Sequence, residues 1–343
     1  MDLEDEWMNF SELSQDNDSI KNIHDKNNEL SFGINENINV PKSSDIYIST
    51  KTKICYFNCD INLFDVFWKL NLIQYYENKE GVIKKQMKFN SLSKKDYENT
   101  ILLIEKEKQN NFVEETVIQH LDTHNGDKIR FKDIRKVSVG ISKKDIMSYR
   151  SKPKSAFYNC FVILVRIIDD NVFKEVHVKI FNTGKIEIPG IQSDKLFKKI
   201  TEYVKNIMIK FYPNINLTEK EETVLINSNF SCGYLINRDT LFKKLKNKYK
   251  INASYDPCSY PGIQCKYKVK GNDNINYELS FMIFRTGSVL IVGKCNEQIL
   301  MDVYEYLKEI LYNEYSEIHQ KGDININNKN KNKKIRKKKI RIL

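Results

Sequence analysis

Cysteine and histidine, the side chains best suited to hold a metal or act as a nucleophile, are poorly spaced for either task in this sequence. Cys55 and Cys59 are four residues apart, and no CxxC or Cys/His pair stands nearby to complete a zinc site. His120 and His124 are expected to share one face of a helix, but no third ligand is evident. The thiol of Cys258 has no histidine near it in sequence to activate it. We therefore expect neither a metal nor another cofactor.

The sequence also lacks the motifs that mark common enzymes. It contains no glycine-rich phosphate loop, no GxSxG, no HExxH and no paired-carboxylate motif on an expected rigid element. No stretch approaches the roughly 18 apolar residues that a membrane span needs. The 7 cysteines are an odd number in a chain without a secretory signal, which is typical of reduced intracellular thiols. These features predict an intracellular protein that is not an enzyme and has no membrane partner.

An internal repeat is the strongest pattern in the chain. The segment IFNTGKIEIPG (180–190) returns as IFRTGSVLIVG (283–293), and the match continues without a gap when 179–208 is aligned with 282–311. Each copy reads as a strand, a Thr-Gly turn, a second strand and a helix, and Gly184 and Gly287 suit the tight turn. The apolar positions at helical spacing are Leu196, Ile200, Val204 and Ile207 in the first copy, and Ile299, Val303, Leu307 and Ile310 in the second.

The repeat extends upstream in a fainter form. INLFDVFWKL (61–70) resembles INRDTLFKKL (236–245), and each is expected to be a short helix that follows a strand, 48–57 or 223–232. The unit is therefore strand, helix, several strands and long helix, which is an α+β pattern. We expect a first repeat at 41–213 with an insertion at about 76–150, and a second repeat at 214–318. Within the insertion, 93–108 is a charge-rich, helix-like run.

Charge is distributed unevenly along the chain, whose net charge is +11. Residues 1–40 hold ten acids against two lysines, whereas 321–343 hold ten bases against one aspartate. We expect both ends, 1–40 and 319–343, to be disordered arms. The basic tail could contact phosphates, serve as a nuclear localisation signal, or simply be solvated. The region 41–320 keeps a net charge of +10, and a folded basic surface favours a polyanionic partner.

Two copies of this unit should form one curved antiparallel sheet with a pseudo-twofold axis and helices on its convex side. YDPCSYPGIQCKY (255–267), FMIFRTGSVLIVGK (281–294) and IFNTGKIEIPG (180–190) then resemble the TATA-box-binding protein family, the saddle-shaped binders of the DNA minor groove. More narrowly, the segments 81–91 and 143–167 and the lysine-rich tail resemble the divergent TATA-binding-like proteins of large nucleocytoplasmic DNA viruses. The resemblance covers about 160 of the 343 residues, mainly 155–210 and 223–313.

The resemblance implies that aromatic side chains near the ends of the sheet wedge between base steps and kink the duplex. Phe181 and Phe284 match one wedge of each pair, and Tyr260 stands in place of the second copy's other wedge. For the first copy the other wedge is either Phe157 or Phe161, and we favour a core position for Phe161.

The resemblance also implies polar residues at the centre of the sheet that read the minor groove, and basic residues along its flanks. The groove-facing candidates are Thr50, Thr52, Asn227 and Asn229. The phosphate candidates are Arg166, Lys185, Lys266 and Lys294. Arg285 should point away from the face of Phe284, and either contacts phosphate or is solvated. Threonine in place of a family asparagine weakens the expectation of strict TATA reading.

By resemblance, the chain is expected to be a general transcription initiation factor that binds as a monomer and bends A/T-rich double-stranded DNA. Its partners would be a factor IIB-like protein and RNA polymerase, in the host nucleus or a cytoplasmic viral factory, and the virion could also carry it. The alternative is a protein-interaction platform in the transcription machinery with weak or non-specific DNA binding. An acidic or covered concave face would favour that alternative.

Overall fold

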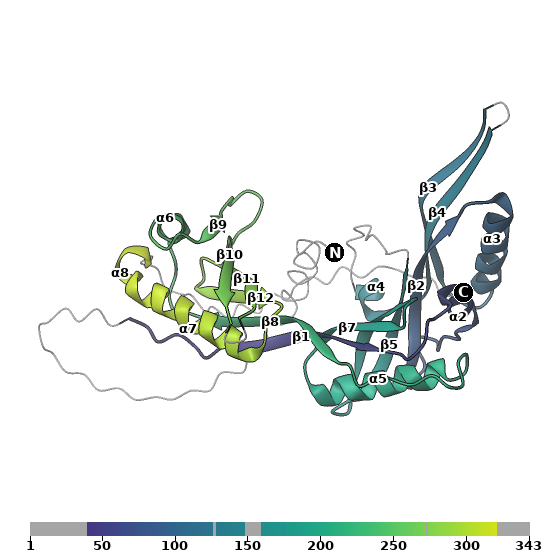
Figure 1. Ribbon diagram of the computed structural model, residues 1–343, viewed down its shortest axis with the longest axis horizontal. Coiled ribbons are helices and arrows are strands. Elements are labelled where there is room, and N and C mark those ends of the chain that lie inside the picture. The colour runs from purple at the N-terminus through teal and green to yellow at the C-terminus, as the bar shows by residue number, and fades with distance from the viewer. Residues whose placement is uncertain (1–39, 126–127, 148–158, 272–273, 321–343) are drawn as a thin grey trace, which may run out of the picture. The chain divides into compact units, whose positions relative to one another are not determined.

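The computed structural model describes residues 40–125, 128–147, 159–271 and 274–320. Nearly all of the expected acidic arm and of the expected basic tail lies outside these residues. Twelve strands form one antiparallel sheet in the order β3-β4-β2-β5-β6-β7-β1-β8-β12-β11-β10-β9. The seventh and eighth strands in this order, β1 (Tyr47–Tyr56) and β8 (Glu222–Ser231), begin the two halves of the chain and pair with each other (Figure 1).

The second half is the simpler one. After β8 come a helix and four strands, the last two of which form a β-hairpin. The chain then crosses the sheet in a long helix. The elements are α6 (Arg238–Asn247), β9 (Asn252–Ser254), β10 (Ile263–Lys270), β11 (Asn276–Ile283), β12 (Ser288–Gly293), α7 (Glu297–Asn313) and α8 (Tyr315–Ile318).

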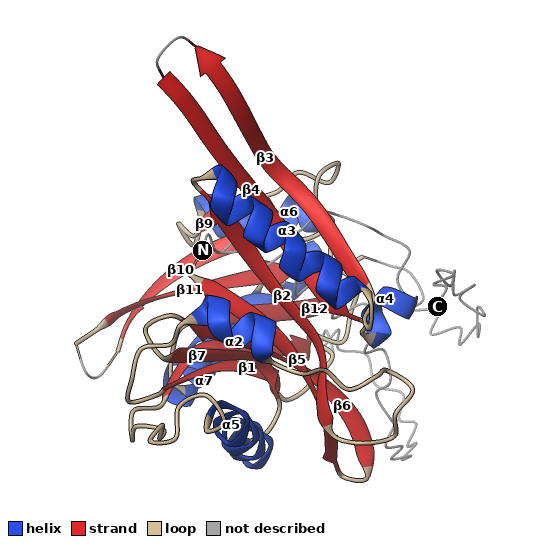
Figure 2. Cartoon of the chain, turned by 90° about the vertical axis from the view of Figure 1, so that its right-hand side faces the viewer, coloured by secondary structure: helices blue, strands red, loops and turns tan. Residues whose placement is uncertain are grey.

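The first half repeats this plan and adds to it. The shared elements are α2 (Leu63–Lys69), β2 (Gly81–Ser91), β5 (Cys160–Asp169), β6 (Val172–Phe181), β7 (Lys185–Ile191) and α5 (Asp194–Met208). By sheet order, β2 stands beside β5 as β9 stands beside β10. The elements without a counterpart are α3 (Lys94–Lys108), β3 (Val113–Asn125), β4 (Lys128–Gly140) and α4 (Lys143–Met147). Figure 2 shows β3 and β4 extending beyond α3 as a two-stranded ribbon.

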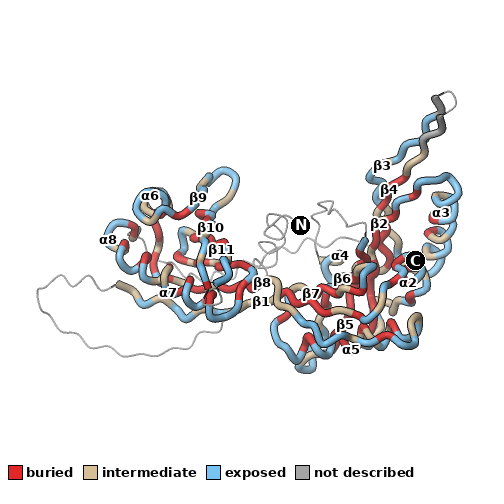
Figure 3. Tube along the Cα trace, viewed as in Figure 1, coloured by how far each residue is buried: buried red, intermediate tan, exposed pale blue. Residues whose placement is uncertain are grey.

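One face of the sheet is covered by helices in both halves. Apolar side chains at every second strand position meet the apolar stripes of α5 and α7, because strand residues alternate between faces and helix residues recur every three or four. Ser193 and Asn296 cap these two helices through their side chains. The result is a first core, which includes Phe67, and a second core (Figure 3).

The predicted fold class is confirmed: the chain is α+β, with two strand–helix–strands–helix repeats in one curved antiparallel sheet. The turn glycines adopt the expected left-handed conformation, with φ of +74° at Gly184 and +81° at Gly287. A Cβ on Gly184 would lie 2.5 Å from the carbonyl oxygen of Cys59, so the turn also needs the small residue for space. The helix expected within 93–108 is confirmed as α3.

The prediction of a helix at His120 and His124 is wrong. Both residues lie in β3, where the backbone alternates, and the side chain of His120 contacts Asp133 of β4. Within the described residues, no group of three or more His, Cys, Asp and Glu side chains could hold a metal ion. No helix in the described part of the chain combines the length and apolar character needed to cross a membrane.

Candidate nucleic-acid interface

The face of the sheet opposite α5 and α7, here called the helix-distal face, carries the groove-facing candidates. Ile226 and Phe230 of β8 pack in the second core, so the alternating residues Asn227 and Asn229 point to the other face. The β1–β8 register pairs Thr50 with Asn227 and Thr52 with Leu225. All four polar candidates from β1 and β8 therefore share the helix-distal face at the junction of the two repeats.

At this junction Asn227 is only 6% exposed and makes an incomplete set of hydrogen bonds. Its side-chain Nδ2 donates to Oγ1 of Thr50 at 3.1 Å, across the β1–β8 pair. Its Oδ1 is buried and accepts no hydrogen bond from the described residues. A buried polar atom without a partner is costly in folded proteins and is often found at functional sites. The Thr50–Asn227 pair is therefore the polar centre of the candidate interface.

Phe284 and Tyr260 form an aromatic pair at the end of the second repeat. Their ring centroids are 6.0 Å apart with an interplanar angle of 58°. Phe284 directly follows β11, where Met282 lies on the helix-distal face and Ile283 lies in the second core. Burial raises the pKa of Tyr260, so its hydroxyl stays protonated at neutral pH. The two expected wedges of the second repeat are thus in contact with each other.

The loop before β10 is folded to hold Tyr260 in place. The Asp256 carbonyl accepts a hydrogen bond from the Tyr260 N–H at 2.9 Å, and its side chain accepts one from the Cys258 N–H at 3.0 Å. Arg238 of α6 donates to the Pro261 carbonyl, fixing the loop to the helix. A Cβ on Gly262 would lie 3.0 Å from Phe284 and 3.2 Å from Tyr260. The Tyr-Pro-Gly sequence therefore supplies both the aromatic ring and the space beside it.

In the first repeat Phe181 occupies the matching position but has different neighbours. It ends β6 opposite Cys160, and the Nζ of Lys185 lies 4.9 Å from its ring centroid. Phe161 is fully buried in the first core beside Phe67, which confirms its expected core position. The alternative partner, Phe157, lies outside the described residues. Among the described residues, only the second repeat shows an aromatic pair at this position.

The phosphate candidates of the first repeat are committed to other contacts. Arg166 is 7% exposed, and its guanidinium donates to the carbonyls of Tyr75 at 2.9 Å and Glu77 at 3.0 Å. These hydrogen bonds tie the loop at Tyr75 and Glu77 to β5, which leaves the guanidinium of Arg166 poorly placed to contact a phosphate. Lys185 lies over Phe181 and 3.9 Å from Glu187, close to the expected wedge.

Acidic side chains are present on the helix-distal face of the first repeat, and the structure gives partners for three of them. Glu187 accepts a hydrogen bond from Lys179 at 2.5 Å. Farther out, the short helix α4 packs on this face, because Lys84 of β2 donates to Asp145 at 2.7 Å. Glu175 accepts a hydrogen bond from the backbone N–H at the start of α4. Part of the first repeat's helix-distal face is therefore ion-paired and covered.

No protein-family model matches the chain. A curated relative, the TATA-box-binding protein-like protein of Acanthamoeba polyphaga mimivirus, is 26% identical over 196 residues. The match covers 50% of this chain and 53% of the relative, so the chain spans about half the length of the curated relative it matches. The chain is similar to viral TATA-box-binding protein-like proteins. This similarity confirms the resemblance expected from the repeated segments. Among solved structures, the TBP of Methanococcus jannaschii is 14% identical, with a TM-score of 0.40, and the match covers 79% of this chain and 99% of that one.

The second repeat also carries exposed bases near the candidate interface. Lys266 is exposed on the helix-distal face of β10. Lys268 and Lys270 share that face and are also exposed, although sequence reasoning missed them. The alternation in KYKVK could have found them, because every second residue of a strand points the same way. Lys294 is exposed just after β12, but it lines a depression with Glu297 at the first turn of α7.

Proposed function

We propose that the chain is a DNA-binding transcription initiation factor that engages the minor groove with the helix-distal face of its sheet. The observation that carries this proposal is the contact pair Phe284–Tyr260 on the same face as the Thr50–Asn227 centre. Rigid aromatic rings beside an uncharged polar centre suit a groove whose floor is apolar and whose base edges carry hydrogen-bonding groups. The mimivirus relative's name adds independent support.

In this mechanism the aromatic rings enter a base step and replace part of the stacking that is lost there. Phe284 and Tyr260 support each other, so the pair enters as one wedge at the end of the second repeat. Phe181 would act at the other end, where Lys185 could turn from its ring to a phosphate. The kink that follows lets more of the sheet contact the widened groove.

The Thr50–Asn227 centre favours relaxed discrimination between A·T and G·C base pairs. A·T pairs present only acceptors in the minor groove, so a reading amide must offer N–H groups. The Asn227 amide already donates to Thr50, and the atom without a partner is its acceptor. We therefore propose A/T-rich binding with relaxed discrimination at the centre, followed by recruitment of a factor IIB-like protein and RNA polymerase by a DNA-bound monomer.

A second candidate function is a protein-interaction platform. It is favoured by the α4 contact over Lys84 and by the Lys179–Glu187 ion pair on the first repeat's face. These features leave less apolar surface for a minor groove in that half. In this alternative, DNA binding would be weak and would depend on charge alone.

The deciding experiment is a titration of residues 41–320 on A/T-rich and G/C-rich duplexes whose labelled ends report bending by energy transfer. The titration is run at two salt concentrations, with the wild type and a Phe181→Ala/Phe284→Ala variant. Bending with A/T preference that the variant loses supports the minor-groove function. Salt-sensitive binding without a bend, unchanged in the variant, would favour the platform.

A further inference from the structure

The outer edge of β3 forms one end of the twelve-stranded sheet, and within the described residues β4 is the strand that pairs with β3. β3 has 13 residues, whereas β9, at the other end of the sheet, has three. Folded proteins usually keep an edge strand short or protect it with lysine or proline, because its outward N–H and C=O groups can pair with another chain. β3 contains three acids but neither of those residues. Its length and composition therefore favour the addition of a further strand.

Three large apolar side chains are exposed on this edge strand. Val117, Ile118 and Leu121 are 55%, 48% and 43% exposed. The β3–β4 register skips Ile118, which forms a β-bulge, and the pairing is regular from Gln119 to the end of the strand. Exposed apolar residues on a long edge strand mark a surface that another chain can cover. The regular segment 119–123, which contains Leu121, is therefore the best candidate for pairing.

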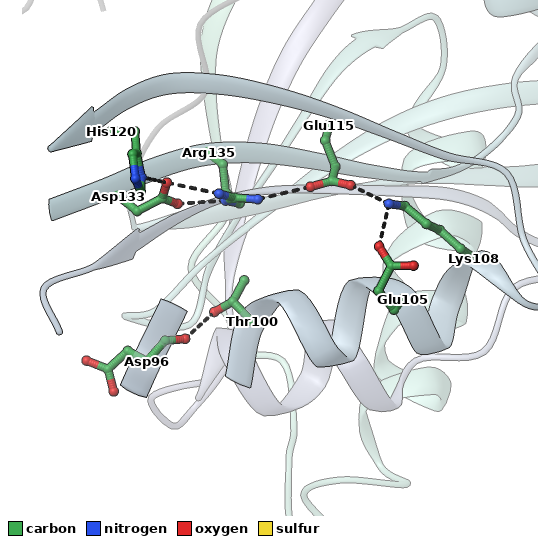
Figure 4. A network of polar contacts seen from close by, with 8 residues as sticks. All are labelled: Asp96, Thr100, Glu105, Lys108, Glu115, His120, Asp133 and Arg135. Carbon is green, nitrogen blue, oxygen red and sulfur yellow. Dashed lines mark hydrogen bonds and ion pairs between the residues drawn. The ribbon is translucent and has the colours of Figure 1, made fainter. Parts of the chain in front are cut away.

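A network of ion pairs at the base of the ribbon holds this edge in place (Figure 4). The buried carboxylate of Asp133 accepts hydrogen bonds from Arg135 at 2.6 and 2.9 Å and contacts Nδ1 of His120 at 2.8 Å. Glu115 lies between Arg135 and Lys108, at 3.1 and 2.8 Å. The network joins β3 and β4 to α3. The edge is therefore ordered before a partner arrives and loses little conformational freedom when it pairs.

The side chains of segment 119–123 alternate between the two faces of the ribbon. His120 contacts Asp133, which belongs to the network beside α3, so the even-numbered residues of the segment face α3. Leu121 and the other odd-numbered residues face the opposite side. In an antiparallel pair of strands, residues opposite each other lie on the same face. A twofold pairing of two such segments therefore places its axis at a residue, which then lies opposite its own copy.

With the axis at Leu121, the segment is complementary to itself. Leu121 lies opposite Leu121 of the second copy, which covers both side chains. His120 lies opposite Asp122 of the second copy, and Asp122 opposite His120, because contacts across a twofold axis are reciprocal. Gln119 meets Thr123 in the same way. An apolar pair at the centre and an imidazole opposite a carboxylate on each side both stabilise an antiparallel sheet.

Moving the axis by one residue removes this match. An axis at Asp122 would set two carboxylates opposite each other, and an axis at His120 would set two imidazoles together. Like charges directly opposite each other destabilise a sheet. Of these three positions, only the axis at Leu121 gives complementary pairs throughout. This self-complementarity favours a second copy of the chain over an unrelated strand.

We propose that two copies of the chain associate through the outer edges of β3, with Leu121 at the twofold axis. The ribbon of one copy then continues into the ribbon of the other as a four-stranded sheet. Because the paired segment is short, the area buried is small, and the dimer forms only at high concentration. This association goes beyond the proposed function and does not depend on it. The Thr50–Asn227 centre lies on β1 and β8, so each copy keeps its own candidate interface.

Disulfide trapping in the full chain tests the register. The background is Cys258→Ser, which removes the exposed native thiol. In this background Leu121→Cys should form a disulfide-linked dimer under mild oxidation, because the two Cβ atoms would lie about 4.5 Å apart. Val117→Cys is the matched control, since Val117 is the more exposed side chain and yet lies away from the axis, beyond the bulge. Its two copies would be roughly 27 Å apart, so it should yield less than about a tenth as much dimer.

Sedimentation velocity over a concentration series measures the association without a disulfide. Leu121→Lys places two like charges at the axis and should raise the dissociation constant of the dimer at least about tenfold. Leu102→Lys makes the same change at a side chain of α3 that is 70% exposed, and should leave the constant as in the wild type.

A wild type that stays monomeric at roughly 1 mM would overturn the proposal and leave the edge of β3 to a strand from another protein. Equal trapping of the two cysteine variants, or an equal shift in the Leu102→Lys control, would overturn it as well. No DNA is present in either measurement, so its failure is separate from a failure of the minor-groove function.

Discussion

The two repeats keep the same helix-facing positions and differ on the helix-distal face. In the aligned hairpins Ile180 corresponds to Ile283 and Ile188 to Ile291, and all four residues are fully buried in their cores. On the other face the aligned residues differ in kind. Lys179 and Glu187 of the first repeat correspond to Met282 and Leu290 of the second, and Lys185 corresponds to Ser288.

Core packing explains why the helix-facing positions hold the same residue types in both repeats, since a polar residue there would lose its hydrogen bonds to water. The helix-distal face is not covered by α5 or α7, and it carries both ion-paired charges and apolar residues. The second repeat retains an apolar face with an aromatic pair, whereas the first has an ion pair, a cover from α4 and an added ribbon. We therefore propose that the second repeat makes most of the groove contact.

The largest expected effect comes from replacing residues on the helix-distal face of the first repeat with the aligned residues of the second. Lys179→Met alone would leave Glu187, which is 9% exposed, with only Lys185 at 3.9 Å, and should cost about 2–3 kcal/mol of unfolding free energy. Lys179→Met/Glu187→Leu copies the second repeat and should return to within about 1 kcal/mol of the wild type, because an apolar pair can replace a buried ion pair. Urea unfolding followed by circular dichroism measures both.

A double variant no more stable than the single one would show that the first repeat's face needs its charges. Lys308→Met is the control, since Lys308 bonds Glu305 on the exposed surface of α7 and should change stability by about 0.5 kcal/mol or less.

The next comparison is between the two wedges. Phe284→Ala should weaken binding to an A/T-rich duplex by about 2 kcal/mol, roughly 30-fold, because a ring that supports Tyr260 is lost. Phe181→Ala should cost about 1 kcal/mol of binding free energy. The loss is smaller because Phe181 is accompanied by Lys185, which lies over its ring, and not by a second aromatic ring among the described residues. Fluorescence titration measures both, and equal losses would contradict the asymmetry.

The fold was largely predictable because the repeat shows the same periodicity twice. The strands around 180–190 and 283–293 and the helices that follow them were all expected, and the core position of Phe161 was too. The alternating pattern fixes these elements locally. His120 was mistaken for a helical residue because β3 pairs with β4 in a ribbon, and the spacing of four also fits a strand.

The candidate site was predictable only where local alternation decides it. Asn227 and Lys266 share a face because the register links them through Val292 and Ser280 of the two strands between them. Arg166 also has the right parity, yet its guanidinium binds the carbonyls of Tyr75 and Glu77, about ninety residues earlier in the chain. Such a long-range contact leaves no local signal in the sequence.

Acid should lower the unfolding free energy of the second repeat at a pH where its candidate interface is still intact. Burial opposes ionisation of Glu314, but hydrogen bonds from Lys244, Lys248 and Tyr249 outweigh it and lower its pKa from 4.5 to about 2. Because the folded-state pKa is below the unfolded one, this contribution is complete above about pH 5 and is lost as the pH falls towards 2. Glu314→Gln should be less stable by about 1 kcal/mol at neutral pH, a loss that disappears near pH 2.

Thermal unfolding at a series of pH values measures the difference between Glu314→Gln and the wild type. Glu317→Gln is the control, because Glu317 is more exposed and contacts Lys244 at 2.8 Å without any contact to Tyr249. A difference that stays constant with pH would mean that Glu314 acts by packing alone.

The smallest change tests whether the wedge of the second repeat depends on the space beside its two rings. Gly262→Ala places a methyl group 3.0 Å from Phe284 and 3.2 Å from Tyr260, so the rings must move apart by a few tenths of an ångström. We expect an unfolding cost below about 1 kcal/mol and a two- to threefold loss of duplex affinity, roughly 0.5 kcal/mol. In a Phe284→Ala background the methyl group has room, so the same substitution should have no effect on affinity. An undiminished loss in that background would show that Gly262 acts through the loop at Pro261, where Arg238 binds, and that the two rings do not act as one wedge.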